Sequence, residues 1–180
     1  KESIFAPRDE WQYKAFVRSN WNLYATGYKR AADNLVEVAG SDHEQDFFVY
    51  PVMFLYRHYL ELRLKEVLLT LQVYFDLPHK LPAHHDLRQL WSEVRPLLER
   101  EWGNEESIAN DDAIEARINE LDQVDKGSFS FRYPVTKDDV PSLKNLPGMA
   151  FIFTTPNHYF VAFFDSDFED GFLSVSKPVH

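Results

Sequence analysis

The sequence of 180 residues predicts an all-α protein, an up-and-down bundle of about five helices with a long ordered loop before the last helix. Apolar residues recur at spacings of three and four along most of the chain, which is the helical period. Groups of proline, glycine and polar residues separate these periodic segments. Aromatic residues make up 16% of the chain, so a single domain over residues 1–180 can bury one hydrophobic core.

The first two helices are expected over residues 8–38 and 47–75. Pro7 and the acids that follow it suit the start of the first helix, because proline and negative charge are both favoured in a first turn. Residues 40–42, Gly-Ser-Asp, predict its end and a new cap. The second helix is nearly apolar on all sides in its first half, and Pro51 falls in its early turns, where a missing N–H costs least.

The middle of the chain predicts two further helices and a loop. Residues 77–82 carry two prolines and cannot continue a helix, so they form a connector. Asp86 is expected to cap a third helix that runs through Glu101. Residues 110–112, Asn-Asp-Asp, are expected to cap a short fourth helix. Residues 126–147 contain three prolines and predict the long loop.

The last segment carries two conflicting signals. Residues 149–154 are rich in aromatic and β-branched side chains, which indicates extended chain. Thr155 and Pro156 instead resemble an N-cap and first-turn pair, and phenylalanines then recur at spacings of three and four as far as Val175. We therefore predict a fifth helix after Pro156.

Composition limits the classes of function. Lys and Arg number 19 against 29 Asp and Glu, and the net charge of −10 opposes loose binding to phosphate backbones or anionic membranes. The chain has no cysteine, which fits a cytoplasmic protein and excludes thiolate sites. Charged residues interrupt the most apolar run, residues 47–77, so no membrane span is expected. The first residue is Lys1 rather than Met, which is compatible with a fragment.

The most informative stretch is residues 56–66, where charged groups interrupt an apolar helix. Arg57, Glu61 and Lys65 are four residues apart and form a stripe, with His58 turned about 100° away from Arg57. One interpretation is a ladder of ion pairs along a helix surface. The other is that Arg57 is buried in a ligand site or in a seam between protein chains, because the surrounding residues are apolar.

Two other segments could bind an anion. His84, His85 and Asp86 stand at the start of the third helix, where free N–H groups attract phosphate and an imidazole can move a proton. The alternative is that Asp86 is only an N-cap and both histidines are solvated. Arg132 and Tyr133 lie in an alternating aromatic segment, where a guanidinium can stack and hold an oxyanion, or where the rings only anchor the loop.

The sequence predicts neither a metal site nor a cofactor. Four histidines, His79, His84, His85 and His158, invite a metal hypothesis, but no pair has the helical spacing of a zinc site. A phosphate-binding glycine loop, a nucleophile elbow and a dinucleotide fingerprint are also missing from the sequence.

Three motifs in this order resemble the HEPN superfamily of helical-bundle proteins, in a bacterial branch. They are an "RHxxELxLK" helix at Arg57–Lys65, an "HDLxxLW" helix start at His85–Trp91 and an "FRYP" loop at Phe131–Pro134. The resemblance covers roughly residues 46–135 and implies an up-and-down bundle that dimerises, in proteins linked to toxin–antitoxin modules, phage defence and RNA cleavage. It also implies that nucleotides or RNA bind in a groove at the dimer seam.

One feature of the family is missing. Catalytic members carry an arginine, four to six arbitrary residues and then a histidine, and no arginine of this chain has a histidine at that spacing. The resemblance therefore favours a binding or regulatory module, a homodimer that takes up nucleotide or RNA and pairs with a cognate partner protein, over a standard ribonuclease. The residues expected to line its ligand groove are Arg57, His58, Glu61, Lys65, His84, His85, Arg132 and Tyr133.

Two alternatives stay open. The first is a metal-independent ribonuclease, a toxin, with a nonstandard site in which an arginine holds the phosphate and a histidine moves the proton. Its candidate catalytic residues are Arg57, His58, His85, Arg132 and His158. The second is a purely structural dimerisation domain, in which the apolar second helix pairs with its own copy.

Overall fold

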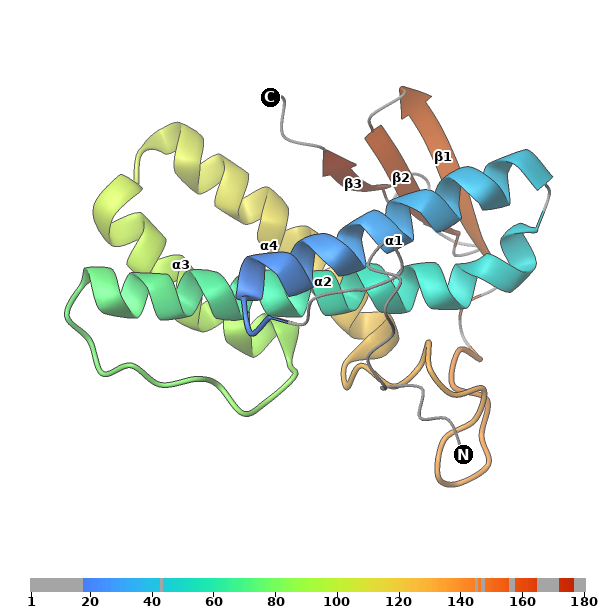
Figure 1. Ribbon diagram of the computed structural model, residues 1–180, viewed down its shortest axis with the longest axis horizontal. Helices are drawn as coiled ribbons and strands as arrows, with labels where there is room; N and C mark the ends of the chain where they lie inside the picture. Colours follow the sequence, from blue (N-terminus) through green and yellow to red (C-terminus); the bar gives the residue numbers. More distant parts are fainter. Residues whose placement is uncertain are drawn as a thin grey trace, which may run out of the picture.

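The described part of the chain folds into four helices followed by a three-stranded sheet (Figure 1). The computed structural model describes residues 18–42, 44–144, 146, 148–155, 158–164 and 172–176, with side chains described through residue 146 except at 40–42, 106 and 107. The elements are α1 Trp21–Asp42, α2 Gln45–Tyr74, α3 Leu87–Trp102, α4 Glu105–Asp125, β1 Gly148–Thr155, β2 His158–Phe164 and β3 Phe172–Ser176.

Helices α1 and α2 form an antiparallel hairpin (Figure 1). Asn20 starts α1, because its side-chain oxygen accepts a hydrogen bond from the backbone N–H of Leu23 at 2.9 Å. The two helices are joined by a buried polar link in which the Tyr56 hydroxyl donates to the Asp33 carboxylate at 2.9 Å. Lys29 pairs with the same carboxylate at 3.0 Å, so the buried charge of Asp33 is compensated.

Helix α3 runs in the same sense as α2, and α4 then returns antiparallel to α3 (Figure 1). The connector 75–86 doubles back along α2, so that His85 meets Glu61 in the middle of α2. At the other end of α3, Glu101 accepts a hydrogen bond from Tyr74 at 3.1 Å. The predicted up-and-down alternation therefore does not hold between α2 and α3.

A single core lies where α2 meets the other three helices. Buried apolar side chains from all four helices and from the loop after α4 meet there. The innermost residues are Ala32, Val36, Val52, Met53, Leu68, Leu87, Leu90, Val94, Ile118, Leu121 and Phe131. This core confirms the helical character of the body of the protein and fixes the positions of the polar groups between its helices.

Several predicted boundaries are close to those observed and others are not. Helix α2 and the Asp86-capped α3 match the predictions within two residues, and Asp86 accepts from the Gln89 N–H at 3.0 Å. Helix α1 starts at Trp21, since residues 18–20 are not helical, and the predicted residues 8–17 lie outside the described chain. It also continues past residue 40, where an end was predicted.

Helix α4 is longer than the predicted short helix. It begins at Glu105 instead of residues 110–112, because Asn104 already accepts the first helical hydrogen bond, from Ile108 at 2.9 Å. The acids at 111 and 112 therefore lie inside the helix. Ile118 and Leu121 face the core, whereas Ile114 is exposed.

The predicted fifth helix is wrong, because β2 and β3 occupy its place. The three strands pair in order as an antiparallel meander, with Phe151 opposite Val161 and Val161 opposite Leu173. The extended character predicted for residues 149–154 is confirmed in β1. Phenylalanine and valine favour strands, and a short run that is apolar throughout, like β2, has no periodicity to distinguish the two states. The chain is thus a helical body with a small sheet instead of an all-α bundle.

Candidate functional site

The Arg57 side chain is the centre of a buried polar network that joins three parts of the fold. It has no exposed surface. Its Nη2 donates to the His85 carbonyl at 2.7 Å, and its Nε donates to the Asp125 carbonyl at 3.0 Å. Its Nη1 pairs with Glu61 at 3.3 Å. The predicted Arg57–Glu61 pair is confirmed, but Arg57 is fully buried within this chain, so it is neither on a helix surface nor placed to touch a ligand or a second chain.

The Glu61 carboxylate contacts three side chains, and the residue is only 3% exposed. One oxygen pairs with Arg57, and the other accepts from Lys65 at 2.9 Å and faces Nδ1 of His85 at 2.7 Å. Burial alone raises the pKa of Glu61, but hydrogen bonds from Lys65 and His85 outweigh burial, so its pKa lies below the usual value. Glu61 is therefore a stable anion at neutral pH.

The His85 side chain is the exposed member of this network. It is 65% exposed, although its Nδ1 touches a buried carboxylate. A carboxylate at this distance favours the tautomer that carries the proton on Nδ1, which leaves Nε2 free to accept a proton. The arrangement presents an oriented imidazole at the surface.

Asp125, the last residue of α4, closes the network from the far side. One of its oxygens accepts from the backbone N–H groups of Phe129 and Ser130 at 2.6 and 2.7 Å, which fixes the loop after α4. The other lies 3.4 Å from Arg57 Nε. Asp125 was not among the predicted site residues, although an acid in a last helical turn opposes the helix dipole and so indicates a specific partner.

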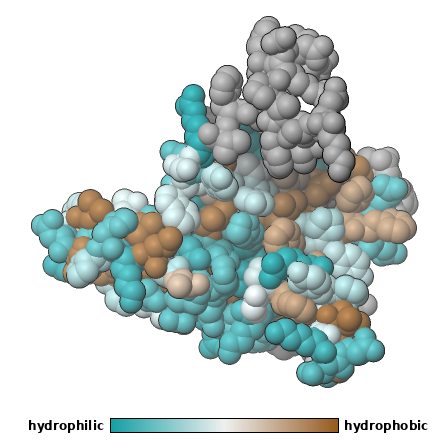
Figure 2. Space-filling model, turned by 60° about the horizontal axis from the view of Figure 1, so that its bottom comes forward, coloured by the Kyte–Doolittle hydropathy of each residue, from teal (hydrophilic) through white to brown (hydrophobic). Residues whose placement is uncertain are grey.

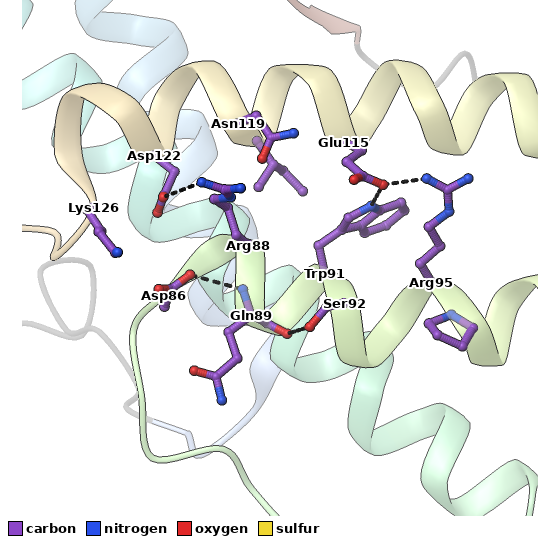
Figure 3. A pocket seen from close by; sticks show the side chains of 12 residues that line it. Asp86, Arg88, Gln89, Trp91, Ser92, Arg95, Glu115, Asn119, Asp122 and Lys126 are labelled. Atoms are coloured by element: carbon purple, nitrogen blue, oxygen red, sulfur yellow. Dashed lines mark hydrogen bonds and ion pairs between the residues drawn. The ribbon is translucent and has the colours of Figure 1, made fainter.

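A cleft of about 530 Å³ lies between α3 and α4 (Figure 3). One of the residues that line it is Asp86, which directly follows His85 in the sequence. Asp86 and Lys126 lie at one end of this cleft, and Arg88 and Asp122 point toward each other across it (Figure 3). Trp91 lines its wall and donates to Glu115 at 3.3 Å. Glu115 also binds Arg95, which pairs with Asp112 and Glu99 as well.

Asp122 is the least compensated buried group of the cleft. Its side chain is 3% exposed, and one of its oxygens has no hydrogen-bond partner among the described residues. Arg88 is its nearest cation, at 3.9 Å, which is too long for a hydrogen bond. Burial and, next, the charge of Asp86 raise the pKa of Asp122. The sequence analysis did not single out this residue.

The His58 and His84 side chains have contact partners other than His85. His58 points to the α1 side of α2, where its ring meets Tyr28 edge-on at 4.4 Å and stacks on Phe54 at 5.9 Å. Burial lowers the pKa of His58, so this ring is neutral in its aromatic surroundings. His84 pairs with Glu93 of α3 at 3.2 Å.

Arg132 and Tyr133 line a second cleft of about 410 Å³ with Tyr50 and Lys144. Arg132 is exposed and lies over the rings of Tyr133 and Phe54, at 5.7 and 5.9 Å. The neighbouring Phe131 is buried in the core, which confirms that this segment anchors the loop. His158 lies in β2, and its side chain is outside the described part of the structure.

Among the described residues, no group of three or more histidine, aspartate or glutamate side chains could hold a metal ion. No described helix is both long and apolar enough to cross a membrane. Comparisons of the chain with protein-family models, with curated proteins and with solved structures found no match.

Proposed function

We propose that the protein is a HEPN-like helical module that binds nucleotide or RNA at the surface around His85. We place it, as a homodimer with a cognate partner protein, in a bacterial toxin–antitoxin or phage-defence setting. The observation that carries the proposal is the exposed His85 imidazole held by the buried Glu61 carboxylate. A ring anchored in this way loses little freedom when it binds a ligand, which favours affinity.

The local charges support an anionic ligand. Arg57 and Lys65 balance Glu61 and Asp125 within the network, so a proton on His85 adds a net positive charge at the surface. Arg88 follows His85 closely in the chain, Lys126 lines the same cleft as Asp86, and both are exposed cations. A phosphate can thus be bound locally despite the net charge of −10.

The test is binding of a labelled single-stranded RNA and of mononucleotides to the wild type, His85→Ala and the control His79→Ala. His79 is exposed on the same connector and contributes to no described contact of the site. We expect His85→Ala to weaken binding about tenfold, the value of one lost charge-assisted hydrogen bond. Equal affinity of the two variants, or no binding by the wild type, would refute the proposal.

A second candidate is a ribonuclease in which His85 moves the proton. The His85–Glu61 pair favours it, because a carboxylate that orients an imidazole is a common arrangement for general acid–base catalysis. Arg57 has no exposed surface and so cannot hold the phosphate in this reaction, which leaves that role to exposed cations such as Arg88. Cleavage of the same RNA in EDTA, lost in His85→Ala and kept in His79→Ala, would favour the enzyme over the binding module.

A further inference from the structure

The cleft between α3 and α4 has the size and the mixed lining of a small-molecule site. Its volume of about 530 Å³ falls within the range usual for ligand pockets. Trp91, Pro96 and Ile118 line it, Asp86, Asp122 and Lys126 lie toward one end, and Arg95 and Glu115 lie toward the other (Figure 3). The cleft therefore suits a ligand that has a flat ring and polar groups at its edges.

The Asp122 carboxylate determines that the polar edge of the ligand must carry hydrogen-bond donors. A buried carboxylate oxygen without a hydrogen-bond partner is unfavourable, and a donor from a ligand would satisfy it. An ionised carboxylate only accepts, and its two oxygens match two parallel N–H donors. Among the common nucleobases, guanine alone carries two adjacent donors, N1–H and N2–H₂, on its Watson–Crick edge.

The cations at the cleft complement the rest of a nucleotide. Arg88 is 59% exposed and lies 3.9 Å from Asp122, so the ion pair between them is weak and Arg88 can move at little cost. Once displaced by a base, Arg88 would be free to meet a phosphate, together with the exposed Lys126. Asp86, at the same end of the cleft, is the next residue after His85.

We propose that this cleft is a guanine-binding subsite, in which the Asp122 carboxylate accepts from N1–H and N2–H₂ of the base while Arg88 and Lys126 face its phosphate. The inference rests on the proposed function and gives it a base preference. The ligand is a guanine base, carried either by a free nucleotide or by single-stranded RNA.

The test compares GMP, AMP, CMP and UMP by calorimetric titration of the whole protein, with the wild type, Asp122→Asn and the control Asp112→Asn. Asp112 lies on the same helix outside the cleft, and its substitution removes the same charge. We expect the wild type to prefer GMP about tenfold, Asp122→Asn to lose that preference and Asp112→Asn to keep it. RNA tetramers with and without a guanosine then distinguish RNA from free nucleotide as the source of the base.

Asp122→Asn removes a buried carboxylate whose pKa burial raises, so we expect it to fold, and a thermal melt checks this. Arg88→Ala, which leaves Asp122 intact, should lower the affinity for GMP more than the affinity for guanosine. Binding that ignores the base and the Asp122 substitution but still needs His85 would overturn the guanine subsite and leave the proposed function standing. Failure of every nucleotide and RNA to bind would overturn both.

Discussion

Glu61 is the residue on which the buried network depends most, because its carboxylate contacts Arg57, Lys65 and His85. Its pKa is lower in the folded protein than its usual value of 4.5, so the folded state takes up a proton less readily than the unfolded chain. The stability that Glu61 contributes is therefore fully present above about pH 4.5 and is lost as the pH falls through the lowered pKa.

This pH dependence of stability gives a prediction for Glu61→Gln. At pH 7 we expect the substitution to lower the free energy of unfolding by about 3 kcal/mol, because Arg57 and Lys65 lose their buried partner. As the pH falls below 4.5 the wild type loses the part of this contribution that depends on the charge of Glu61, so the difference between the two proteins should become smaller. Urea unfolding at several pH values measures the difference.

Glu66→Gln is the matched control for this prediction. Glu66 also pairs with an arginine of α2, Arg63, but both side chains are partly exposed, so its loss should cost less than about 1 kcal/mol. A difference between wild type and Glu61→Gln that stayed constant down to pH 3 would contradict the assigned role of the carboxylate.

Arg57 links helix α2 to two other segments of the fold. Its guanidinium on α2 binds the carbonyl of His85 before α3 and the carbonyl of Asp125 at the end of α4, so a single side chain sets the relative positions of three segments. Both carbonyls would lose this donor if Arg57 were removed. Loss of RNA binding in an Arg57 variant would for this reason be no evidence that Arg57 touches RNA.

We predict that Arg57→Met lowers the free energy of unfolding by about 3–5 kcal/mol, because it leaves Glu61 and Asp125 buried with fewer partners. Arg63→Met on the same helix removes a partly exposed pair and should cost less than about 1 kcal/mol. Urea denaturation at pH 7 compares the two variants. Similar losses would show that the network around Arg57 adds little to stability.

The sequence could predict the parts of this arrangement that depend on local spacing. Residues four apart on α2 predict the Arg57–Glu61–Lys65 stripe, and an acid before an apolar run predicts the Asp86 cap. The contact of Arg57 with Asp125 joins residues 68 apart, and no local pattern encodes it. The sheet was missed because β2 is a short, almost continuous apolar run, and periodicity alone does not distinguish such a run from a segment of buried helix.

The net charge of −10 limits the ways in which the whole protein can bind nucleic acid. On the face shown in Figure 2 hydrophilic residues predominate, and hydrophobic ones form separate small groups. A protein with this charge has no general attraction for phosphate, so binding must come from a few cations at one place. Arg88 and Lys126 are exposed cations near the site, and the His85 imidazole is also exposed, close to Asp86 and Arg88 in the sequence.

Two cations, Arg88 and Lys126, predict a shallow dependence of RNA affinity on salt. Each phosphate neutralised on a single strand contributes a slope of about −0.7 to the logarithm of the binding constant against the logarithm of salt concentration, so we expect a slope of about −1.4. Fluorescence anisotropy of a labelled single-stranded RNA over a series of salt concentrations measures it, and Lys126→Ala should make the slope shallower by about 0.7. A slope steeper than about −4 would mean that a longer basic track elsewhere on the protein binds the RNA, and the surface around His85 would then not be the main site.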